Sequence, residues 1–493
     1  MTGVTLQSII DALRDAELLA GTRGALPATV NTLTDDSRAL QRGGVFVAVR
    51  GAERDGHDYL DAAAKTGAAA AIVDDRSRTE LPAIIVRDTR RAASVAAAAF
   101  HGFPARALRL VGVTGTNGKT TTVGMLRHLL DAPEARAASI GTLGVLVGSE
   151  GAAMPGGGGL TTPGPVELQR VLREFVDAGV RTVAMETSSH ALHQHRVDTL
   201  RFGAAVFTNL TRDHLDYHGT MDEYFAAKAM LVDLLTDDGV AITNGDDEAW
   251  NALPPTPRRV RFGLSKTADV RAESVRFAPR GSCWTLVIGN ERHDVTLPLI
   301  GDFNVANALA AAAAAWALGM PAVRIAEKLR RMPQVPGRLE ILSEEPVVLR
   351  DYAHTPDALE RALRAVRPFA TNRLIVVFGC GGDRDRGKRP EMGHIAQRDA
   401  DLAIVTSDNP RTEDPERILD DIEAGMTAGA HERLEDRRAA IARAVSLAGE
   451  GDVVLLAGKG HETYQVRGTV KYPFDEREIV HEIIRDGSAP VRA

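Results

Sequence analysis

The sequence is poor in aromatic residues and cysteine, and it carries no excess of basic charge. Aromatic residues make up only 4% of the 493 residues, so alanine, valine and leucine have to fill the hydrophobic cores. The two cysteines, Cys283 and Cys380, lie far apart, which argues against a disulfide framework and favours a reducing cytoplasm. A formal net charge of -7 gives no electrostatic reason to expect binding to nucleic acid or to a membrane surface.

Segments for secretion and membrane insertion are also not apparent. The stretch from Met1 to Ala20 carries charged side chains from Asp11 to Glu17, which is not the pattern of a signal peptide. The apolar run from Ala308 to Leu318 is too short and too rich in alanine to cross a bilayer, and it predicts a buried helix. We therefore expect a cytoplasmic protein that does not associate with membranes or nucleic acid.

Length and turn residues predict three α/β domains. About three domains are expected for this length, and turns at His101–Pro104 and Val335–Arg338 divide the chain into residues 1–104, 105–336 and 337–493. In the second and third blocks, short apolar runs alternate with helical segments, which indicates βαβ units around mainly parallel sheets. The predicted fold class is α/β, with a doubly wound central sheet, a Rossmann-like C-terminal domain and a smaller N-terminal α/β domain.

The predicted elements are short and well separated. We expect helices at Arg91–Phe100 and Thr121–Leu130 and a mobile glycine-rich loop at Met154–Gly159. The expected strands are Val45–Val49, Ala70–Val73, Leu108–Val113, Thr182–Met185, Ala204–Phe207, Val240–Thr243, Val347–Leu349, Leu374–Phe378, Leu402–Val405 and Val453–Ala457.

Polar or glycine residues follow nearly every strand of the second and third blocks. Ligands of doubly wound sheets bind outside the carboxyl ends of the strands, so these positions predict the ligand sites. They are Thr114–Gly115, Glu186–Thr187, Thr208–Asn209, Asp351–Tyr352, Gly379–Cys380, Ser407–Asp408 and Gly458–Lys459.

The segment Gly112–Thr120 has the pattern of a phosphate-binding loop. It reads G-V-T-G-T-N-G-K-T between a predicted strand and a predicted helix, the context that supports G-x-x-x-x-G-K-[ST]. Lys119 can reach the β- and γ-phosphates, and the Thr120 hydroxyl can hold Mg²⁺. The pattern alone does not separate kinases, motor ATPases, GTPases and ligases. The predicted ATP-binding residues here are Gly115, Thr116, Asn117, Gly118, Lys119, Thr120 and Thr121.

Three more polar side chains are candidates for a metal site beside this loop. Glu186 ends a predicted strand and could bind Mg²⁺, but acidic residues also favour the first turn of a helix. His214 lies in a polar cluster, where a single histidine is usually structural. Lys228, taken by itself, is typical of a helical lysine with a solvated tip.

The amino-acid sequences of these segments resemble motifs of the Mur ligase family. The matching stretches are T-G-T-N-G-K-T (114–120), E-T-S-S-H (186–190), N-L-T-R-D-H-L-D-Y-H-G (209–219) and A-A-K (226–228). The resemblance implies that Lys228 is carbamylated by CO₂, which turns a cationic amine into an anion. It also implies that Glu186, His214 and carbamylated Lys228, with Thr120, position two Mg²⁺ ions that neutralise the triphosphate.

Further family motifs imply contacts with ATP and with a UDP-linked substrate. By the resemblance, Asn304 contacts adenine, Arg338 of P-G-R reaches ATP and Asp351 binds the ribose. The implied contacts of the UDP-linked muramoyl dipeptide are Ser37, Ala52, Glu53, Arg54, Thr161, Thr162, Ser188, Gln194 and Arg196. Arg196 suits a substrate with carboxylates, because a guanidinium can grip a carboxylate through two hydrogen bonds.

The segment Asp408–Arg411 distinguishes between amino-acid substrates. It reads D-N-P-R, which by itself favours a turn. In the family, D-N-P-R marks enzymes that add diaminopimelate, and its arginine binds the distal carboxylate, which lysine lacks. The resemblance implies a diaminopimelate pocket formed by Arg384, Asp408, Asn409, Pro410, Arg411, Gly458 and Glu462, with Glu462 facing the distal amino group.

The expected function is that of an ATP-dependent ligase of peptidoglycan synthesis that acts as a monomer on small molecules. It would join diaminopimelate to the D-glutamyl carboxylate of the UDP-linked muramoyl dipeptide. A lysine-adding ligase is the nearest alternative, and Arg411 argues against it. Folylpolyglutamate synthase shares the phosphate loop, but the first block and D-N-P-R argue against it. A non-catalytic nucleotide sensor would not need Lys119, Glu186, His214 and Lys228 together.

Overall fold

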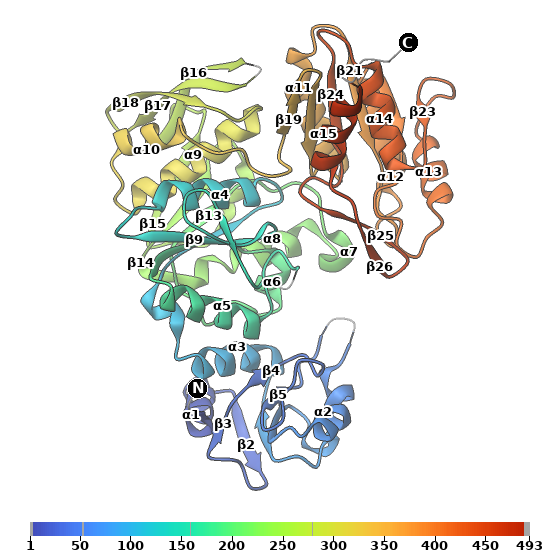
Figure 1. Cartoon of the computed structure of the whole chain (residues 1–493). Coiled ribbons are helices and arrows are strands. Elements are labelled where there is room, and N and C mark those ends of the chain that lie inside the picture. The colour runs from blue at the N-terminus through green and yellow to red at the C-terminus, as the bar shows by residue number, and fades with distance from the viewer. Residues whose placement is uncertain (1–2, 52–53, 158, 279, 488–493) are drawn as a thin grey trace. The chain divides into compact units, whose positions relative to one another are not determined.

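The chain forms two compact units, which are described separately. The computed structural model describes residues 3–51, 54–157, 159–278 and 280–487. Unit one comprises Met1–Arg271 and Asn307–Ile325, and unit two comprises Ala272–Ala306 and Ala326–Ala493 (Figure 1). Within the described residues, no helix combines the length and the apolar character needed to cross a bilayer.

The N-terminal part of unit one is a five-stranded sheet in the order β2-β7-β6-β5-β4. Neighbouring residues of β5 face opposite sides, because side chains alternate along a strand: Val45 and Val47 pack with α1 and α3, and Phe46 packs with α2. The elements are β1 (Val4–Thr5), α1 (Leu6–Asp15), β2 (Leu19–Arg23), β3 (Thr29–Val30), β4 (Leu33–Thr34), β5 (Val45–Val47), η1 (Gly56–Tyr59), α2 (Leu60–Thr66), β6 (Ala70–Val73), η2 (Arg76–Arg78), β7 (Ala83–Val86), α3 (Thr89–Phe100) and η3 (Pro104–Ala107).

A larger sheet forms the rest of unit one. Its central strands β9, β12, β8, β13, β14 and β15 are parallel, and the β10–β11 hairpin extends one edge antiparallel. The elements are β8 (Arg109–Thr114), α4 (Lys119–Leu130), β9 (Arg136–Gly141), β10 (Gly144–Val147), β11 (Ala152–Met154), α5 (Pro165–Asp177), β12 (Val180–Glu186), α6 (Ser189–His193), β13 (Phe202–Phe207), α7 (Leu215–His218), α8 (Met221–Ala229), η4 (Val232–Leu234), β14 (Leu235–Asn244), η5 (Glu248–Ala252) and β15 (Arg258–Gly263). The next strand, β16 (Val270–Ala278), begins in unit one, and most of its residues belong to unit two.

The alanine-rich run is a buried helix, as predicted. It lies in α9 (Asp302–Ala317), where Ala308 and the six alanines from Ala310 to Ala315 are 0% exposed. Alanine permits close packing because it has no side chain beyond Cβ, which fits a chain with so few aromatic residues. The predicted loop at Met154–Gly159 begins at the end of β11, and its Gly158 lies outside the described residues.

Unit two contains a six-stranded sheet in the order β19-β20-β24-β21-β22-β23. All neighbours are parallel except β19, which is antiparallel to β20. Apolar residues of α11, α12 and α13 cover one face, and those of α14 and α15 cover the other. The carboxyl ends of β20, β24, β21 and β22 therefore meet at one edge, which positions the predicted amino-acid residues together.

The elements that complete the chain are the following. They are β17 (Gly281–Ile288), β18 (Glu291–Leu297), α10 (Ala322–Leu329), β19 (Glu340–Glu344), β20 (Val347–Asp351), α11 (Pro356–Val366), η6 (Arg367–Phe369), β21 (Leu374–Phe378), α12 (Lys388–Asp399), β22 (Leu402–Val405), α13 (Pro415–Glu423), β23 (Glu432–Arg433), α14 (Arg437–Leu447), β24 (Val453–Ala457), β25 (Tyr464–Arg467), β26 (Val470–Pro473) and α15 (Glu476–Gly487).

Candidate active site

The phosphate-loop segment connects β8 to α4, as the sequence predicted. Two of its glycines have conformations that other residues rarely adopt, with φ of 145° at Gly115 and 85° at Gly118. A Cβ atom at Gly115 would lie 1.9 Å from Thr208 Oγ1, and one at Gly118 would lie 2.3 Å from Asn307 Oδ1. Both backbone shape and close packing therefore require glycine at these two positions.

The segment after β13 holds this loop in place. Thr208 Oγ1 donates a hydrogen bond to the Asn117 carbonyl at 2.7 Å. The Asn117 N–H donates to Asn209 Oδ1 at 2.9 Å, and the Thr116 N–H donates to the Asn209 carbonyl at 2.8 Å. The sequence pattern marked Thr208 and Asn209 as a strand end, but their support of the phosphate loop could not be deduced from it.

Two lysines far apart in sequence meet at one carbonyl oxygen of the loop. Lys119 Nζ donates to the Gly115 oxygen at 2.9 Å and to the Thr116 oxygen at 2.8 Å. Lys228 Nζ donates to the same Gly115 oxygen at 2.8 Å. The helical lysine with a solvated tip is thereby excluded, because Lys228 is only 1% exposed and lies 4.3 Å from the centre of the Tyr224 ring.

This environment disfavours a charged Lys228. Burial lowers the pKa of Lys228 well below its usual value, and the neighbouring Lys119 ammonium lowers it further, while Asp213 opposes them. A neutral amine is the form of lysine that reacts with CO₂. The chemistry of Lys228 therefore fits the carbamate that the family resemblance implied.

His214 lies near these lysines, and Glu186 ends the strand next to β8. Desolvation lowers the pKa of His214, and Lys119 and Lys228 act in the same direction, whereas Asp213 raises it. Glu186 is 1% exposed; its Oε1 accepts the Thr142 N–H at 2.8 Å and its Oε2 accepts the Thr142 hydroxyl at 3.2 Å. Glu186 is thus a fixed acceptor at the end of β12 rather than the first residue of α6.

The predicted metal ligands do not form a conventional cluster. Among the described residues, no three His, Cys, Asp or Glu side chains are grouped as metal ligands. The predicted set instead combines Glu186, His214, the buried Thr120 hydroxyl and Lys228. An unmodified lysine amine adds no negative charge, so this set fits a divalent cation only when Lys228 is carbamylated.

Five residues predicted to bind the muramoyl dipeptide are joined by hydrogen bonds. Arg196 donates to the Thr162 carbonyl at 2.9 Å and to Gln194 Oε1 at 2.6 Å. Thr162 Oγ1 lies 3.3 Å from Ser188 Oγ and donates to the Glu186 carbonyl at 2.8 Å. Thr161 joins the same group because its hydroxyl lies 3.4 Å from that of Thr142. The network ends at Glu186, next to the phosphate loop.

The predicted uridine contacts are less completely described. Ser37 is half-buried in the turn where the Ala39 N–H donates to the Asp36 carbonyl at 3.0 Å. Arg54 is exposed, and its carbonyl accepts the Gly51 N–H at 2.8 Å. Ala52 and Glu53 lie outside the described residues, so their predicted role stays a prediction.

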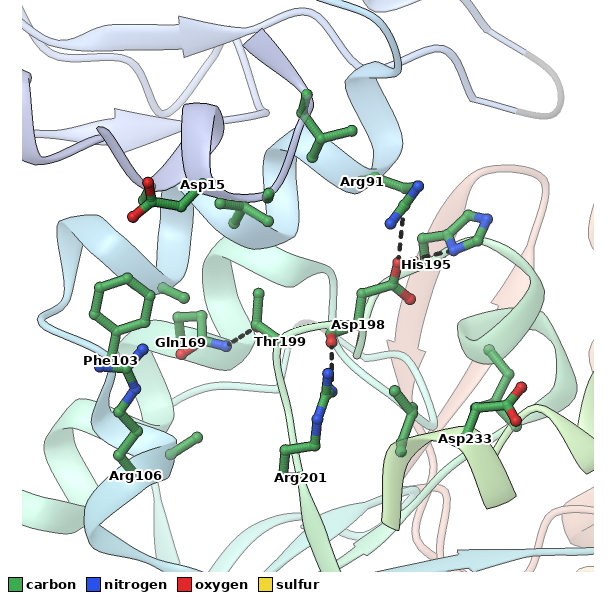
Figure 2. A pocket seen from close by; sticks show the side chains of 18 of the residues that line it. Asp15, Arg91, Phe103, Arg106, Gln169, His195, Asp198, Thr199, Arg201 and Asp233 are labelled. Carbon is green, nitrogen blue, oxygen red and sulfur yellow. Dashed lines mark hydrogen bonds and ion pairs between the residues drawn. The ribbon is translucent and has the colours of Figure 1, made fainter. Parts of the chain in front are cut away.

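A separate pocket of about 680 Å³ lies in unit one, shown in Figure 2. Its described lining includes Phe103, Gln169, His195 and Asp198, and it includes none of the residues predicted for ATP or substrate. His195 nevertheless lies between Gln194 and Arg196 in sequence and has a positive φ of 58°. Its ring pairs with Asp198 at 2.9 Å, which stabilises the turn that carries Arg196.

In unit two, Arg338 and Asp351 meet at the end of β20. Asp351 Oδ2 accepts the Leu339 N–H at 2.7 Å, and the Arg338 guanidinium carbon lies 4.6 Å from the centre of the Tyr352 ring. Burial raises the pKa of Asp351 to about 6, although the Arg338 charge acts to lower it. Asn304 is 1% exposed and donates to the Ile300 carbonyl at 2.7 Å in the first turn of α9.

The predicted diaminopimelate residues gather at the carboxyl edge of the same sheet. Asp408 Oδ2 is buried and has no hydrogen-bond partner in the described structure. A Cβ atom at Gly458 would lie 2.7 Å from this oxygen, so Gly458 leaves room for it. The Gly382 N–H donates to the Asn409 carbonyl at 2.9 Å, which joins the loop of Arg384 to the D-N-P-R segment.

The side chain of Arg411 is directed by its main chain. Arg411 has a positive φ of 53°, and its N–H donates to the Val466 carbonyl at 3.1 Å. The Gly468 N–H donates to the Arg411 carbonyl at 2.6 Å, and Arg411 Nη1 donates to the Gly382 carbonyl at 2.8 Å. Glu462 lies across the same edge and accepts Asn409 Nδ2 at 2.8 Å.

A buried ion pair holds the carboxyl ends of β22 and β24 together. Arg437 and Glu476 are 1% and 0% exposed, and Arg437 Nε lies 2.8 Å from Glu476 Oε1. Arg437 also donates to the carbonyls of Ser407 and Ala457 at 3.4 and 2.9 Å. These carbonyls directly precede Asp408 and Gly458, so Arg437 links the ends of β22 and β24.

Replacing Glu476 with glutamine should lower the free energy of unfolding by about 3 kcal/mol, because it leaves the Arg437 charge buried without a carboxylate. Urea denaturation followed by circular dichroism measures this difference. Glu482→Gln is the control, since Glu482 pairs with Arg438 at 2.7 Å on the surface and should cost at most about 0.5 kcal/mol. Equal losses in the two variants would contradict the supporting role of the pair.

The two units have the features of one class of protein. A phosphate loop in a doubly wound sheet and a second parallel sheet with a ligand edge are typical of a nucleotide-dependent α/β enzyme. Three segments match domains of one family: residues 29–107 match the Mur ligase family catalytic domain, 113–315 the Mur ligase middle domain, and 337–460 the Mur ligase glutamate ligase domain.

Relatives match over nearly the whole chain. A protein of Geobacillus kaustophilus named UDP-N-acetylmuramoyl-L-alanyl-D-glutamate–2,6-diaminopimelate ligase is 44% identical over 464 residues, which is 92% of this chain and 94% of that protein. A protein of Geobacter metallireducens with the same name is 46% identical, covering 94% and 96% of the two chains. The chain belongs to the Mur ligase family.

Solved structures agree with the three-domain α/β fold of this family. A structure titled with the same diaminopimelate ligase name has a TM-score of 0.67 and 32% identity, and the match covers 99% of both chains. Folylpolyglutamate synthase of Mycobacterium tuberculosis with ADP has a TM-score of 0.64 at 20% identity and covers 75% of this chain. The second likeness is one of fold alone.

Proposed function

We propose that this chain is an ATP-dependent ligase that joins 2,6-diaminopimelate to UDP-N-acetylmuramoyl-L-alanyl-D-glutamate in peptidoglycan synthesis. The observation that carries this function is the D-N-P-R segment, whose Asp408, Asn409 and Arg411 lie with Gly458 and Glu462 at one sheet edge. An amino acid with a carboxylate and an amine at each end matches this mixture of guanidinium and carboxylate groups. Relatives over 40% identical that bear this name support the same substrate.

The residues of unit one are proposed to activate the D-glutamyl carboxylate. A carboxylate oxygen attacks the γ-phosphorus of ATP, and the bond from this phosphorus to the oxygen of ADP breaks, which gives an acyl phosphate and ADP. Lys119 leaves the carbonyls of Gly115 and Thr116 to contact the β- and γ-phosphates. The network of Thr162, Gln194 and Arg196 holds the dipeptide, whose D-glutamyl end then lies beside the loop.

The residues of unit two are proposed to present the amine. The diaminopimelate nitrogen attacks the acyl carbon, phosphate leaves with the electrons of the carbon–oxygen bond, and the nitrogen loses one proton. Arg411 grips the distal carboxylate, and Glu462 accepts hydrogen bonds from the distal amino group. Asn304, Arg338 and Asp351 are proposed to bind the adenosine part of ATP, while Ser37, Ala52, Glu53 and Arg54 bind the uridine diphosphate.

Magnesium is proposed to be held by Thr120, Glu186, His214 and carbamylated Lys228. Two bound Mg²⁺ ions would neutralise phosphate charge and so reduce repulsion between the carboxylate and ATP. The chain's own contribution is to bury Lys228 and to lower the pKa of its amine, which favours the neutral form beside Lys119. Glu186, fixed by Thr142, offers an acceptor of constant orientation at the end of β12.

Formation of ADP with three acceptors tests this function. In the presence of the UDP-linked dipeptide and Mg²⁺, ADP should form with meso-diaminopimelate, and kcat/KM with lysine should be at least about a thousand-fold lower, because lysine leaves Arg411 unpaired. The LL isomer, as the third acceptor, reports the preferred configuration. Turnover with lysine at a similar rate would indicate the lysine-adding ligase. Turnover only with a folate and glutamate would indicate folylpolyglutamate synthase, and nucleotide binding without turnover a sensor.

A further inference from the structure

The amino-acid site of unit two contains a buried ammonium that the proposed reaction does not use. Lys459 is 0% exposed, although it lies between Gly458 and Gly460 in the turn that follows β24. Its Nζ lies 3.2 Å from both Asn409 Oδ1 and Glu462 Oε2. A lysine is almost never fully buried unless its charge is paired, so this contact with Glu462 compensates a large desolvation cost.

The contacts of Lys459 fix one oxygen of the Glu462 carboxylate. Asn409 Nδ2 donates to the same Oε2 atom at 2.8 Å. Asn409 is itself held, because its Oδ1 accepts the Val466 N–H at 2.8 Å as well as Lys459 Nζ. Within the described residues, Oε1 of Glu462 accepts no hydrogen bond, so it is the oxygen left for a ligand.

Two aromatic rings lie near the ammonium. Lys459 Nζ lies 5.8 Å from the centre of the Tyr464 ring and 5.9 Å from that of Phe474. The hydrogen bonds of the ammonium in the described structure go to Asn409 and Glu462 and not to Tyr464. The ammonium of Lys459, the amide of Asn409 and the carboxylate of Glu462 therefore form one hydrogen-bonded group.

We propose that Lys459 is a positioning residue that gives the site its preference for acceptors with a second amino group. This inference rests on the proposed function, in which Glu462 meets the distal amine of diaminopimelate. Lys459 and Asn409 bind Oε2 so that Oε1 points at that amine in one orientation. Without Lys459, the half-buried carboxylate can rotate toward solvent, and the ligand loses a charge-assisted hydrogen bond.

Charge repulsion between Lys459 and the ligand acts in the opposite direction. The Lys459 charge repels the ammonium of the ligand, and its removal relieves that repulsion. The Glu462 carboxylate lies 3.2 Å from Lys459 Nζ and offsets most of this charge, so the net repulsion of the ligand should amount to a few-fold effect. A hydrogen bond to a charged group changes affinity by about 10- to 100-fold, so loss of orientation should dominate.

Two acceptors separate the effect of positioning from damage to the fold. 2-Aminopimelate has both carboxylates and the reacting amine of diaminopimelate but lacks the distal amine. Lys459→Met keeps the length and apolar contacts of the side chain. It should lower the ratio of kcat/KM for diaminopimelate to that for 2-aminopimelate by at least about tenfold, while the value for 2-aminopimelate stays within about threefold. In the double variant with Glu462→Gln, the ratio should fall no further than in Glu462→Gln alone.

Lys471→Met is the matched control, because Lys471 also contacts the Tyr464 ring, at 4.0 Å, but from the exposed side. This variant should keep the wild-type ratio. An unchanged or higher ratio in Lys459→Met overturns the proposal, and so does an equal loss with both acceptors, which would mark Lys459 as a purely structural residue. Lys459→Gln, which keeps a donor without the charge, should give an intermediate ratio. Wild-type protein inactive with diaminopimelate would instead refute the proposed function.

Discussion

Replacing Lys228 with arginine should reduce kcat at least about a thousand-fold, with little change in the KM for diaminopimelate. Arginine keeps a permanent positive charge, whereas the proposed site needs Lys228 to pass from a neutral amine to an anion. In that step the amine nitrogen attacks the carbon of CO₂, an N–C bond forms, and one proton is released to solvent. Burial and the Lys119 ammonium lower the pKa of Lys228 well below its usual value, which favours the neutral amine that this step requires.

The position of Lys228 explains why the charge change should matter so much. Its Nζ and that of Lys119 both donate to the Gly115 carbonyl, at 2.8 and 2.9 Å. Two ammonium groups at one oxygen repel each other, while an ammonium beside a carbamate attracts it. Carbamylation would therefore stabilise the loop and create a negative charge for a cation in the same step.

Kinetics and mass spectrometry test this prediction together. Wild-type protein should lose activity when CO₂ is removed from the buffer and regain it with bicarbonate. With bicarbonate present, the intact mass of the wild-type protein should exceed its sequence mass by one CO₂, and that of Lys228→Arg should not. Lys266→Arg is the control, since Lys266 lies exposed in a turn before β16. Lys228→Arg with more than about a tenth of wild-type kcat, or activity indifferent to CO₂, would rule out the carbamate.

Strands buried on both faces could be predicted from the sequence, and their ends with them. The bounds of β6, β21, β22 and β24 are those expected, because each is a continuous apolar run between polar or glycine residues. The hairpins β10–β11 and β17–β18 were not anticipated. β11 and β18 are the edge strands of their sheet, and much of each is exposed, so they do not carry the continuous apolar pattern that identifies a buried parallel strand.

The role of a single residue could be predicted from the sequence only where a known motif assigns that role. The glycines of the phosphate loop follow from the motif, but the hydrogen bond from Lys228 to the Gly115 carbonyl, 113 positions away in sequence, could not be foreseen. The position of Lys459 at a strand end was predicted, but its contacts were not, for a similar reason. A lysine between two glycines is typical of an exposed turn, and only the folded sheet edge brings Asn409 and Glu462 to its ammonium.

Replacing Arg411 with alanine should lower kcat/KM for diaminopimelate by about 100- to 1,000-fold, because two charge-assisted hydrogen bonds to the distal carboxylate are lost. The value for lysine should change by no more than about threefold, since lysine offers this guanidinium nothing to bind, so the preference for diaminopimelate collapses. The main chain of Arg411 is held by the Val466 carbonyl and the Gly468 N–H, which fixes the direction of the side chain before any ligand arrives.

The Arg411→Ala variant removes the guanidinium and keeps the backbone conformation. A positive φ of 53° at a residue with a side chain costs free energy, and alanine would meet the same cost, so the variant removes the guanidinium without relieving the backbone. Arg417→Ala is the matched control, because Arg417 lies exposed on α13 of the same unit. A purified Arg411→Ala protein that still prefers diaminopimelate over lysine as strongly as the control would show that another group reads the distal carboxylate. In that case Arg384, in the neighbouring loop, is the residue to replace next.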